Sequence, residues 1–599
     1  MLRPRSLLRR IPDVTQPLRP PKSHVPKPST RLFTSNSQLL LISSPLNRPQ
    51  LPFLHSPTAL PSRLQNPITF RQHTPRLIST ERRKKITDGL KIGFTAYALL
   101  LLCYIIDMGL YQEKIERIYP TPPEWSLWTR WWLRSARAKQ EPERFGELST
   151  DWVEVGEMYR DLVGWLEDVK GEGKGVKEIG CEDGGAVFVD GLGKTGYDIE
   201  GMSEAWRTGY FQALMGAAEC AEKLDGWVAD KKIGATTPAS YMVGPSNPDP
   251  KRVPPGVKVP REEFAEPAYD SPELYYMRVL TTTGFKPNQK LDAALAYADW
   301  LDFKGLKETS EDMYGWAMDI ATSGLRVDAG QVVDNEITGV LKDTAGKYLT
   351  DNLQRVTTAY GVHQVRGGDL SKALSVFLSL LRARRELPTP PTSTLAASQE
   401  PHSPSTDGIN RSLMSSITET LRSYIIPPPY PLSTRTGNEP IYRTTATACD
   451  EAGLMVYIGE ILFASSSRDT GLSWTRDAVD MAESTLVQLS DEDEQATDPT
   501  SINRPDVHER CRDCLRTGLA NWRQMVHKLV VKAENEELET LDRAKGVWFG
   551  AKKMLQEKEQ QRKRWEAEEL ILVDRTKELR PILGEMGMTG LGKSSISFP

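Results

Sequence analysis

The feature that most constrains this chain is an apolar segment near its N-terminal end. Residues 92–111 read IGFTAYALLLLCYIIDMGLY, and Asp107, near the C-terminal end of the segment, is its single charged residue. At about 1.5 Å per helical residue, 20 residues extend about 30 Å, the thickness of a bilayer core. A buried helix of a soluble protein normally has polar residues on its outer face, and this segment has almost none. We therefore predict a single transmembrane helix over 92–111.

The segment ahead of it, residues 1–80, has the composition of an import signal. It contains ten arginines and two lysines but one acidic residue, Asp13, and it is rich in Ser, Pro and Leu. An Arg- and Ser-rich, acid-poor N-terminus is typical of a mitochondrial transit peptide rather than a secretory signal. The alternative is a merely disordered basic tail, since the prolines argue against a folded domain in either case. We predict a transit peptide over 1–80.

Charge sets the expected orientation of the span. The basic cluster directly ahead of it stays on the side from which the helix inserts; it consists of Arg82, Arg83, Lys84, Lys85 and Lys91. With a leader that enters the matrix, the N-terminus lies in the matrix, the span in the mitochondrial inner membrane and the C-terminal body in the intermembrane space. The first 80 residues carry +11 and the whole chain −4, so the body is strongly acidic. An acidic body is not expected to bind nucleic acid.

The body has the pattern of an all-α chain with internal repeats. Residues 149–166 match W-x2-L-G-x2-Y, the start of a tetratricopeptide (TPR) repeat, and residues 291–321 and 354–387 match other parts of that repeat. The packing positions are Trp152, Val155, Gly156, Tyr159, Tyr297, Ala298, Tyr314, Ala317, Tyr360, Gly361, Ala373 and Phe377. A small residue lets the paired helix approach, and an aromatic ring fills the space beside it. Three matches predict a TPR-like helical-hairpin solenoid after the span.

Composition divides the body into segments. We predict TPR-like repeats with insertions over 120–385, a Ser/Thr/Pro-rich disordered linker over 388–440, TPR-like repeats over 441–555, a charged C-terminal helix over 556–580 and a flexible tail over 581–599.

Four tryptophans follow the span at roughly helical spacing, with arginines between them: Trp125, Trp128, Trp131 and Trp132. They fit a helix lying at the level of the lipid headgroups. They fit equally well a first body helix that simply packs its indoles into the core. The sequence favours neither interpretation.

Together these features resemble a known family. A basic leader, one span, the stretch YPTPPEW…LRSA (119–136) and LSTDWVEVGEMYRDL (148–162) at the head of a repeat array are similar to the fungal TPR adaptor subunit of the i-AAA protease. The resemblance implies a mitochondrial inner-membrane protein whose repeats lie in the intermembrane space. It also implies delivery of substrates to the membrane-bound, ATP-dependent metalloprotease. The glycine-rich insertion at 170–198 and the linker at 388–440 depart from the family pattern.

Motifs for catalysis are weak. Gly587–Ser594 matches G-x4-G-K-[ST], but five residues follow Ser594, too few for the helix that a phosphate loop requires. The Cys511-x-x-Cys514 pair has no second ligand pair for zinc, so two part-buried thiols on one helix are expected. We expect no catalytic activity, no cofactor, no metal and no small-molecule substrate.

We therefore expect a non-catalytic, membrane-anchored scaffold that binds polypeptides and serves as a substrate adaptor for the i-AAA protease in mitochondrial protein quality control. The alternative is an inner-membrane assembly or organising factor for a respiratory or translocase complex. If the repeats pack as in known TPR arrays, residues of the first helices line a concave peptide groove. The predicted groove residues are Glu157, Arg160, Asp292, Asp299 and Asp302. Their acidic share favours basic or unfolded client proteins, and the AAA metalloprotease is the expected partner.

Overall fold

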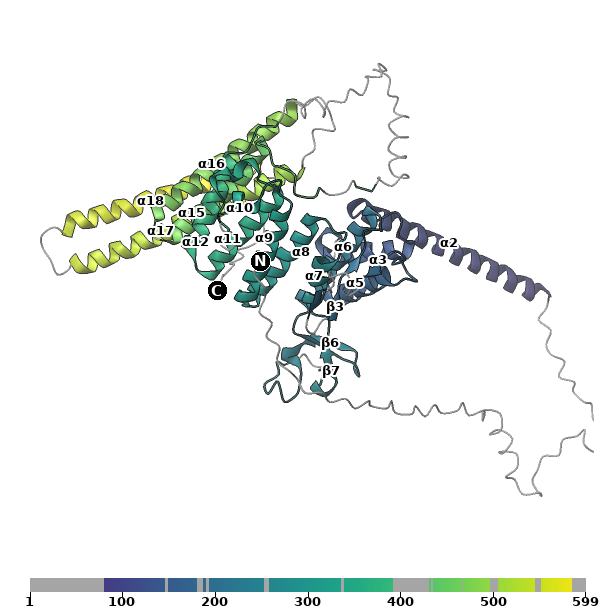
Figure 1. Ribbon diagram of the computed structural model, residues 1–599. Coiled ribbons are helices and arrows are strands. Elements are labelled where there is room, and N and C mark those ends of the chain that lie inside the picture. The colour runs from purple at the N-terminus through teal and green to yellow at the C-terminus, as the bar shows by residue number, and fades with distance from the viewer. Residues whose placement is uncertain are drawn as a thin grey trace, which may run out of the picture. The chain divides into compact units, whose positions relative to one another are not determined.

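The computed structural model describes residues 80–145, 149–179, 187–189, 193–252, 258–334, 339–390, 430–431, 435–465, 467–495, 505–544 and 551–583. The chain separates into two compact units, Met1–Ala96 and Tyr97–Pro599. Most described residues are helical and the strands are short (Figure 1), which confirms a mostly helical fold. The predicted transit peptide up to residue 79 and the tail from residue 584 lie outside the described residues.

Helix α2 (Thr80–Ile118) contains the predicted span and extends beyond both of its ends. Among the described residues it is the one helix long and apolar enough to cross a membrane. Its apolar side chains face outward; Leu100, for example, is 71% exposed. The polar flanks remain helical, with ion pairs one turn apart at Lys85–Glu81 and Arg117–Glu113. The prediction of one candidate membrane-spanning helix is confirmed by the length and composition of α2.

The body consists of consecutive helices joined by turns and short insertions. The first five are α3 (Leu127–Gln140), α4 (Pro142–Phe145), α5 (Trp152–Glu167), α6 (Glu204–Lys223) and α7 (Pro272–Thr281). Then come α8 (Pro287–Phe303), α9 (Lys307–Ser323), the short α10 (Ala329–Val332), α11 (Asp351–Gly367), α12 (Leu370–Arg385), α15 (Thr445–Ala464), α16 (Arg468–Gln495), α17 (Pro505–Ala544) and α18 (Ala551–Leu579).

From α8 onward these helices pack as pairs. The pairs are α8–α9, α11–α12, α15–α16 and α17–α18. Short connections make the partners antiparallel: between α11 and α12, Gly368 takes a left-handed conformation (φ 89°) and the Asp369 side chain accepts a hydrogen bond from the Lys372 amide. Neighbouring pairs also touch, at α8–α11, α12–α15 and α15–α17.

The insertions form small antiparallel sheets. β1 (Lys177–Glu178) pairs with β4 (Tyr197–Asp198), and β2 (Val187–Val189) pairs with β3 (Gly193–Thr195). β5 (Trp227–Asp230) lies between β6 (Ala235–Pro238) and β7 (Ala265–Pro267). These strands occur in the connections before and after α6. Helix α6 itself packs directly against α5 and α7.

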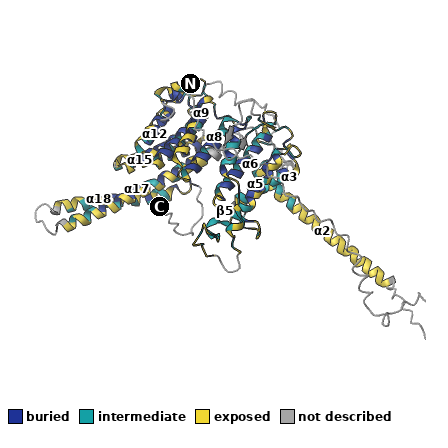
Figure 2. Cartoon of the chain, turned by 60° about the horizontal axis from the view of Figure 1, so that its bottom comes forward, coloured by how far each residue is buried: buried dark blue, intermediate teal, exposed yellow. Residues whose placement is uncertain are grey.

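Among the described residues, two apolar clusters make up the core. Figure 2 shows the buried residues in dark blue along the helices of the body. The larger cluster extends from Trp125, just before α3, to Ala478 of α16. The smaller one is formed by α15, α16, α17 and α18, with Trp522 and Trp565 among its large side chains. Helix α15 contributes to both, so it joins the two clusters.

Two segment boundaries differ from the predictions. Residues 435–440, predicted as part of a disordered linker over 388–440, are ordered: Asn288 and Asn352 donate backbone hydrogen bonds to the carbonyls of Thr436 (3.1 Å) and Gly437 (3.0 Å). The first amides of a helix have no acceptor within it, so a chain segment passing across them is held in place. Residues 391–429 and 432–434 of the linker lie outside the described residues. The charged helix predicted over 556–580 begins five residues earlier, as α18.

Candidate protein-binding surface

The third predicted repeat places a small residue directly against an aromatic ring. A Cβ atom added at Gly361 of α11 would lie 2.7 Å from Cζ of Phe377 on α12. Phe377 and Ala373 are fully buried, and Tyr360 is nearly so. The α11–α12 pair is therefore held at a separation that only glycine at position 361 permits.

The second predicted repeat contacts the third. Ala298 and Ala317 are fully buried between α8 and α9, and Tyr297 stacks on Tyr276 at 5.6 Å between ring centroids. Tyr314 of α9 meets the ring of Tyr360 edge-on at 6.2 Å. The sequence-matched residues of two separate hairpins thus share one packing layer.

The first predicted repeat is packed by an insertion rather than by a following hairpin. A Cβ atom at Gly156 of α5 would lie 2.9 Å from the Tyr269 ring, whose hydroxyl donates to the Gly156 carbonyl at 2.9 Å. Val155 and Tyr159 are fully buried, and Trp152 is partly buried under Lys223. Tyr159 packs against Gly216 of α6, a small-residue contact that the repeat pattern did not single out.

A hollow of about 430 Å³ crosses α8, α11 and α15, the first helices of three hairpins, and Tyr314 of α9 also lines it. It is lined by Leu295, Asp299, Tyr314, Gln354, Arg355, Thr358, Ala359, Val362, Arg366 and Tyr457. We call this set the α8–α11–α15 groove. Tyr457, which sequence reasoning missed, is 41% exposed and stacks on buried Phe377 at 5.2 Å. Its ring gives the groove an aromatic surface at one end.

Two of the predicted groove aspartates have basic partners. Asp299 forms an ion pair with Arg366, and Asp292 forms one with Arg355, both arginines being supplied by α11. The Asp302 side chain is 7% exposed, and both of its carboxylate oxygens lie 2.9 Å from Nδ1 of His363. Arg355 and Arg366 of the facing helix α11 therefore balance the charges of Asp292 and Asp299, which α8 presents.

Glu157 and Arg160 lie elsewhere. Glu157 is exposed on α5. The Arg160 guanidinium lies over the Tyr269 ring at 4.3 Å and pairs with Asp270 at 3.2 Å. The structure thus brings Asp299 alone of the predicted residues into the α8–α11–α15 groove.

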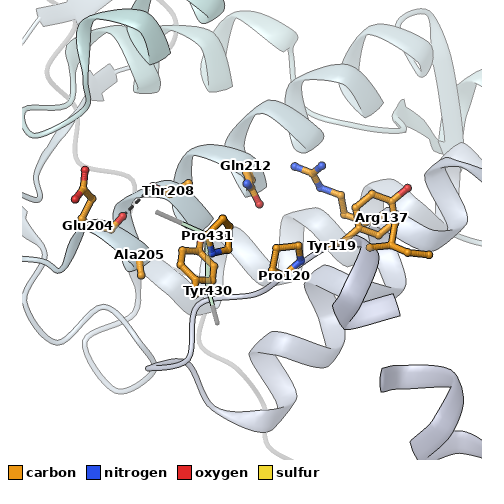
Figure 3. A pocket seen from close by; sticks show the side chains of 10 residues that line it. Tyr119, Pro120, Arg137, Glu204, Ala205, Thr208, Gln212, Tyr430 and Pro431 are labelled. Carbon is orange, nitrogen blue, oxygen red and sulfur yellow. Dashed lines mark hydrogen bonds between the residues drawn. The ribbon is translucent and has the colours of Figure 1, made fainter. Parts of the chain in front are cut away.

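A second hollow of about 420 Å³ lies where α2 ends (Figure 3). One part of it is lined by Ile118, Tyr119, Pro120 and Arg137. Another part is lined by Glu204, Ala205, Thr208 and Gln212 of α6. Tyr430 and Pro431, from the predicted linker, also line the hollow. Burial raises the pKa of the Tyr430 phenol to about 12, and the nearby Arg137 partly opposes that shift.

The four tryptophans after the span divide between the two interpretations. Trp125 is buried and Trp132 packs against the core, whereas Trp128 is 73% exposed. Trp131 lies between them, with its ring 6.1 Å from that of Trp128 and 5.3 Å from that of Trp132. Packing accounts for the first and last members of the set.

The expectation for the CxxC pair is wrong at Cys511. Cys511 of α17 forms a disulfide with Cys449 of α15, with Cα atoms 5.2 Å apart. Cys514 is half-buried, and burial raises the pKa of its thiol to about 12. Across the part of the chain that the structure describes, no three His, Cys, Asp or Glu side chains are placed to hold a metal ion. The Gly587–Ser594 motif lies outside the described residues.

Comparison of the sequence with known protein families and with curated proteins finds no match.

Proposed function

We propose that this protein is a membrane-anchored scaffold that binds polypeptide segments in the α8–α11–α15 groove. The observation that carries the proposal is the groove itself, formed by side chains from three successive hairpins. Leu295, Ala359, Val362 and Tyr457 provide apolar contact, and the Asp299–Arg366 pair provides polar contact beside them. Apolar anchors flanked by polar groups suit a helical or extended peptide.

A TPR-like solenoid is the finer fold in this proposal. It is supported by the Gly361–Phe377 contact and by the packing of Tyr314 against Tyr360 between neighbouring hairpins. Nearest-neighbour packing of this kind is how repeat arrays expose a long binding face.

We place the body in the intermembrane space, with the N-terminus in the matrix. The basic cluster ahead of the span supports this orientation. The Cys449–Cys511 disulfide adds support, because disulfides persist in oxidising rather than reducing compartments. The partner in the proposal is the membrane AAA metalloprotease, and this part rests on the family resemblance in the sequence.

The experiment is affinity purification of tagged full-length protein from gently solubilised mitochondria, read by mass spectrometry. The groove variant is Tyr457→Ala with Val362→Glu, and the control is Trp165→Ala, an exposed aromatic on α5. We expect wild type and control to recover the metalloprotease with many client proteins, and the groove variant to lose the clients at least about ten-fold, which corresponds to about 1.4 kcal/mol.

Unchanged client recovery by the groove variant would show that the groove is not the binding site. Recovery of one stoichiometric respiratory or translocase complex, without the protease, would favour the assembly-factor alternative.

A further inference from the structure

The body begins to pack on α2 within one helical turn after the apolar segment ends. From Ile92 to Tyr111 the side chains are exposed, apart from the half-exposed Met108, whereas Ile115 and Glu116 are buried. Glu116 is bound by Arg130 at 3.0 Å and Arg134 at 2.9 Å. These contacts fix α3 to the end of α2. If α2 crosses a bilayer, the membrane surface therefore lies against this junction.

Aromatic rings gather at the same level. The short helix α4 returns to α2, so that Phe145 lies 6.4 Å from the ring of Tyr111 and 6.3 Å from that of Tyr119. Tyr111 is the last residue of the apolar segment. Aromatic side chains at the end of a span characteristically lie among lipid headgroups.

Basic side chains lie over these rings. Lys114 is 5.9 Å from the Phe145 centroid, and Arg137 and Arg144 are 5.8 and 5.9 Å from that of Tyr119. Three acidic residues of the junction are bound by arginines: Glu113 by Arg117, Glu116 by Arg130 and Arg134, and Glu141 by Arg144. Basic groups outnumber acidic ones, and Arg137 lies beside Tyr119 (Figure 3).

Distances along α2 agree with a headgroup contact. At 1.5 Å per residue, Lys114 lies about 4.5 Å beyond Tyr111, and the end of α2 about 10 Å beyond it. The headgroup layer on each side of the bilayer core is about 5–8 Å thick. For an upright α2, Lys114 therefore falls within that layer, and Tyr119, with the Arg137 and Arg144 side chains over its ring, lies just outside it.

We propose that Tyr111, Lys114, Tyr119, Arg137, Arg144 and Phe145 form a juxtamembrane collar that binds the headgroups of anionic phospholipids. The proposal rests on the membrane anchor of the proposed function, but not on the peptide groove. A basic residue near the surface contributes about five-fold to binding of an anionic leaflet. Rings and cations of the collar come from α2, α3 and α4 together, so the lipid contact would also hold the body against the membrane.

The test is photocrosslinking of the full-length protein in vesicles that contain phosphatidylcholine and phosphatidylglycerol, with a photoreactive group on the phosphatidylglycerol headgroup. We expect labelled peptides from 111–119 and 142–145, together with labelling of the basic cluster at 82–91 on the other side of the span. In the triple variant Lys114→Gln, Arg137→Gln, Arg144→Gln, the labelling of the collar peptides should fall at least about five-fold. Its labelling at 82–91 should not change, which provides an internal control.

A second control neutralises Lys84, Lys85 and Lys91, and it should lower labelling at 82–91 alone. To separate loss of lipid contact from misfolding, the circular dichroism of the triple variant is compared with that of wild type. Wild-type collar labelling should also fall as salt is raised. Equal collar labelling by a photoreactive phosphatidylcholine, or labelling confined to 82–91, would overturn the collar. Alkaline carbonate extraction separates this result from failure of the anchor itself, since an unanchored chain would be released.

Discussion

At the residue scale, Gly361 and Phe377 set the distance between two helices. Phe377 is fully buried, and its ring occupies the space where a side chain at position 361 would begin. Asp302 and His363 make a second close contact, between α8 and α11, and Ser310 and Tyr314 of α9 also donate hydrogen bonds to Asp302. One carboxylate thus joins the three helices α8, α9 and α11.

We predict that Gly361→Ala destabilises the protein by about 1–3 kcal/mol because the added methyl group forces Phe377 or the α11 backbone to shift. Gly315→Ala on α9 is the matched control, since nothing lies within 4 Å of an added Cβ there. Alanine favours a helix over glycine, so this control should be stabilised by about 0.5–1 kcal/mol. Denaturant titration measures both, and equal stabilisation of the two variants would contradict the close contact.

The charges of the groove show where reasoning from sequence stops at this scale. Asp292 and Asp299 lie on one helix, and a reading of that helix alone predicts an acidic face. Their partners Arg355 and Arg366 are 63 and 67 residues further along the chain. Small-to-large packing positions such as Gly361 and Phe377 were predictable because both lie in one hairpin. The pairing of charges depends on which hairpins become neighbours, and local spacing does not encode this.

At the element scale, the 435–440 segment works as a brace across two helix starts. Asn352 is fully buried; its side-chain amide donates to the Thr436 carbonyl at 3.1 Å and to the Asn438 side chain at 2.7 Å. Pro- and Ser-rich composition predicts disorder for the whole region, because such residues bury little apolar surface. Backbone hydrogen bonds to distant helices hold this part instead, and they leave no mark on composition.

We predict that Asn352→Ala weakens the protein by about 1–3 kcal/mol, because it leaves the Thr436 carbonyl and the Asn438 side chain without these hydrogen bonds. Limited proteolysis should then cut within 435–443 faster than in wild type. Thr358→Ala, on the same helix but in the groove, is the control and should keep the wild-type cleavage rate there. An identical cleavage pattern in Asn352→Ala would show that the brace is held by other contacts.

At the scale of the whole molecule, α15 joins the two apolar clusters and the disulfide ties α17 to it. Cys449 and Cys511 are 62 residues apart in sequence and belong to the smaller cluster, whereas Leu454 and Ile458 of the same helix α15 belong to the larger one. The sequence predicted helices in this region, but not the disulfide, because the two cysteines are not close in the chain. The long α2 was predictable since its signal is one uninterrupted run of apolar residues.

We predict that Cys449→Ser lowers stability by about 2–4 kcal/mol, because the disulfide restricts a long loop in the unfolded chain. Wild-type protein should show the same loss in the presence of a reductant, and the variant should be insensitive to it. Cys220→Ser, a buried cysteine outside the disulfide, is the control for reductant sensitivity. A wild-type melting curve that a reductant leaves unchanged would contradict a stabilising role.

The clamp of Glu116 between Arg130 and Arg134 has a mechanical consequence. A span of fixed length tilts when the bilayer is thinner than its apolar segment and straightens when the bilayer is thicker. A flexible hinge after the span would absorb such tilting, but here the helix continues into the body and is bound by a buried ion pair. If α2 crosses a bilayer, the junction therefore transmits the tilt of the span to the body, so that local bilayer thickness would set the angle between the body and the membrane surface.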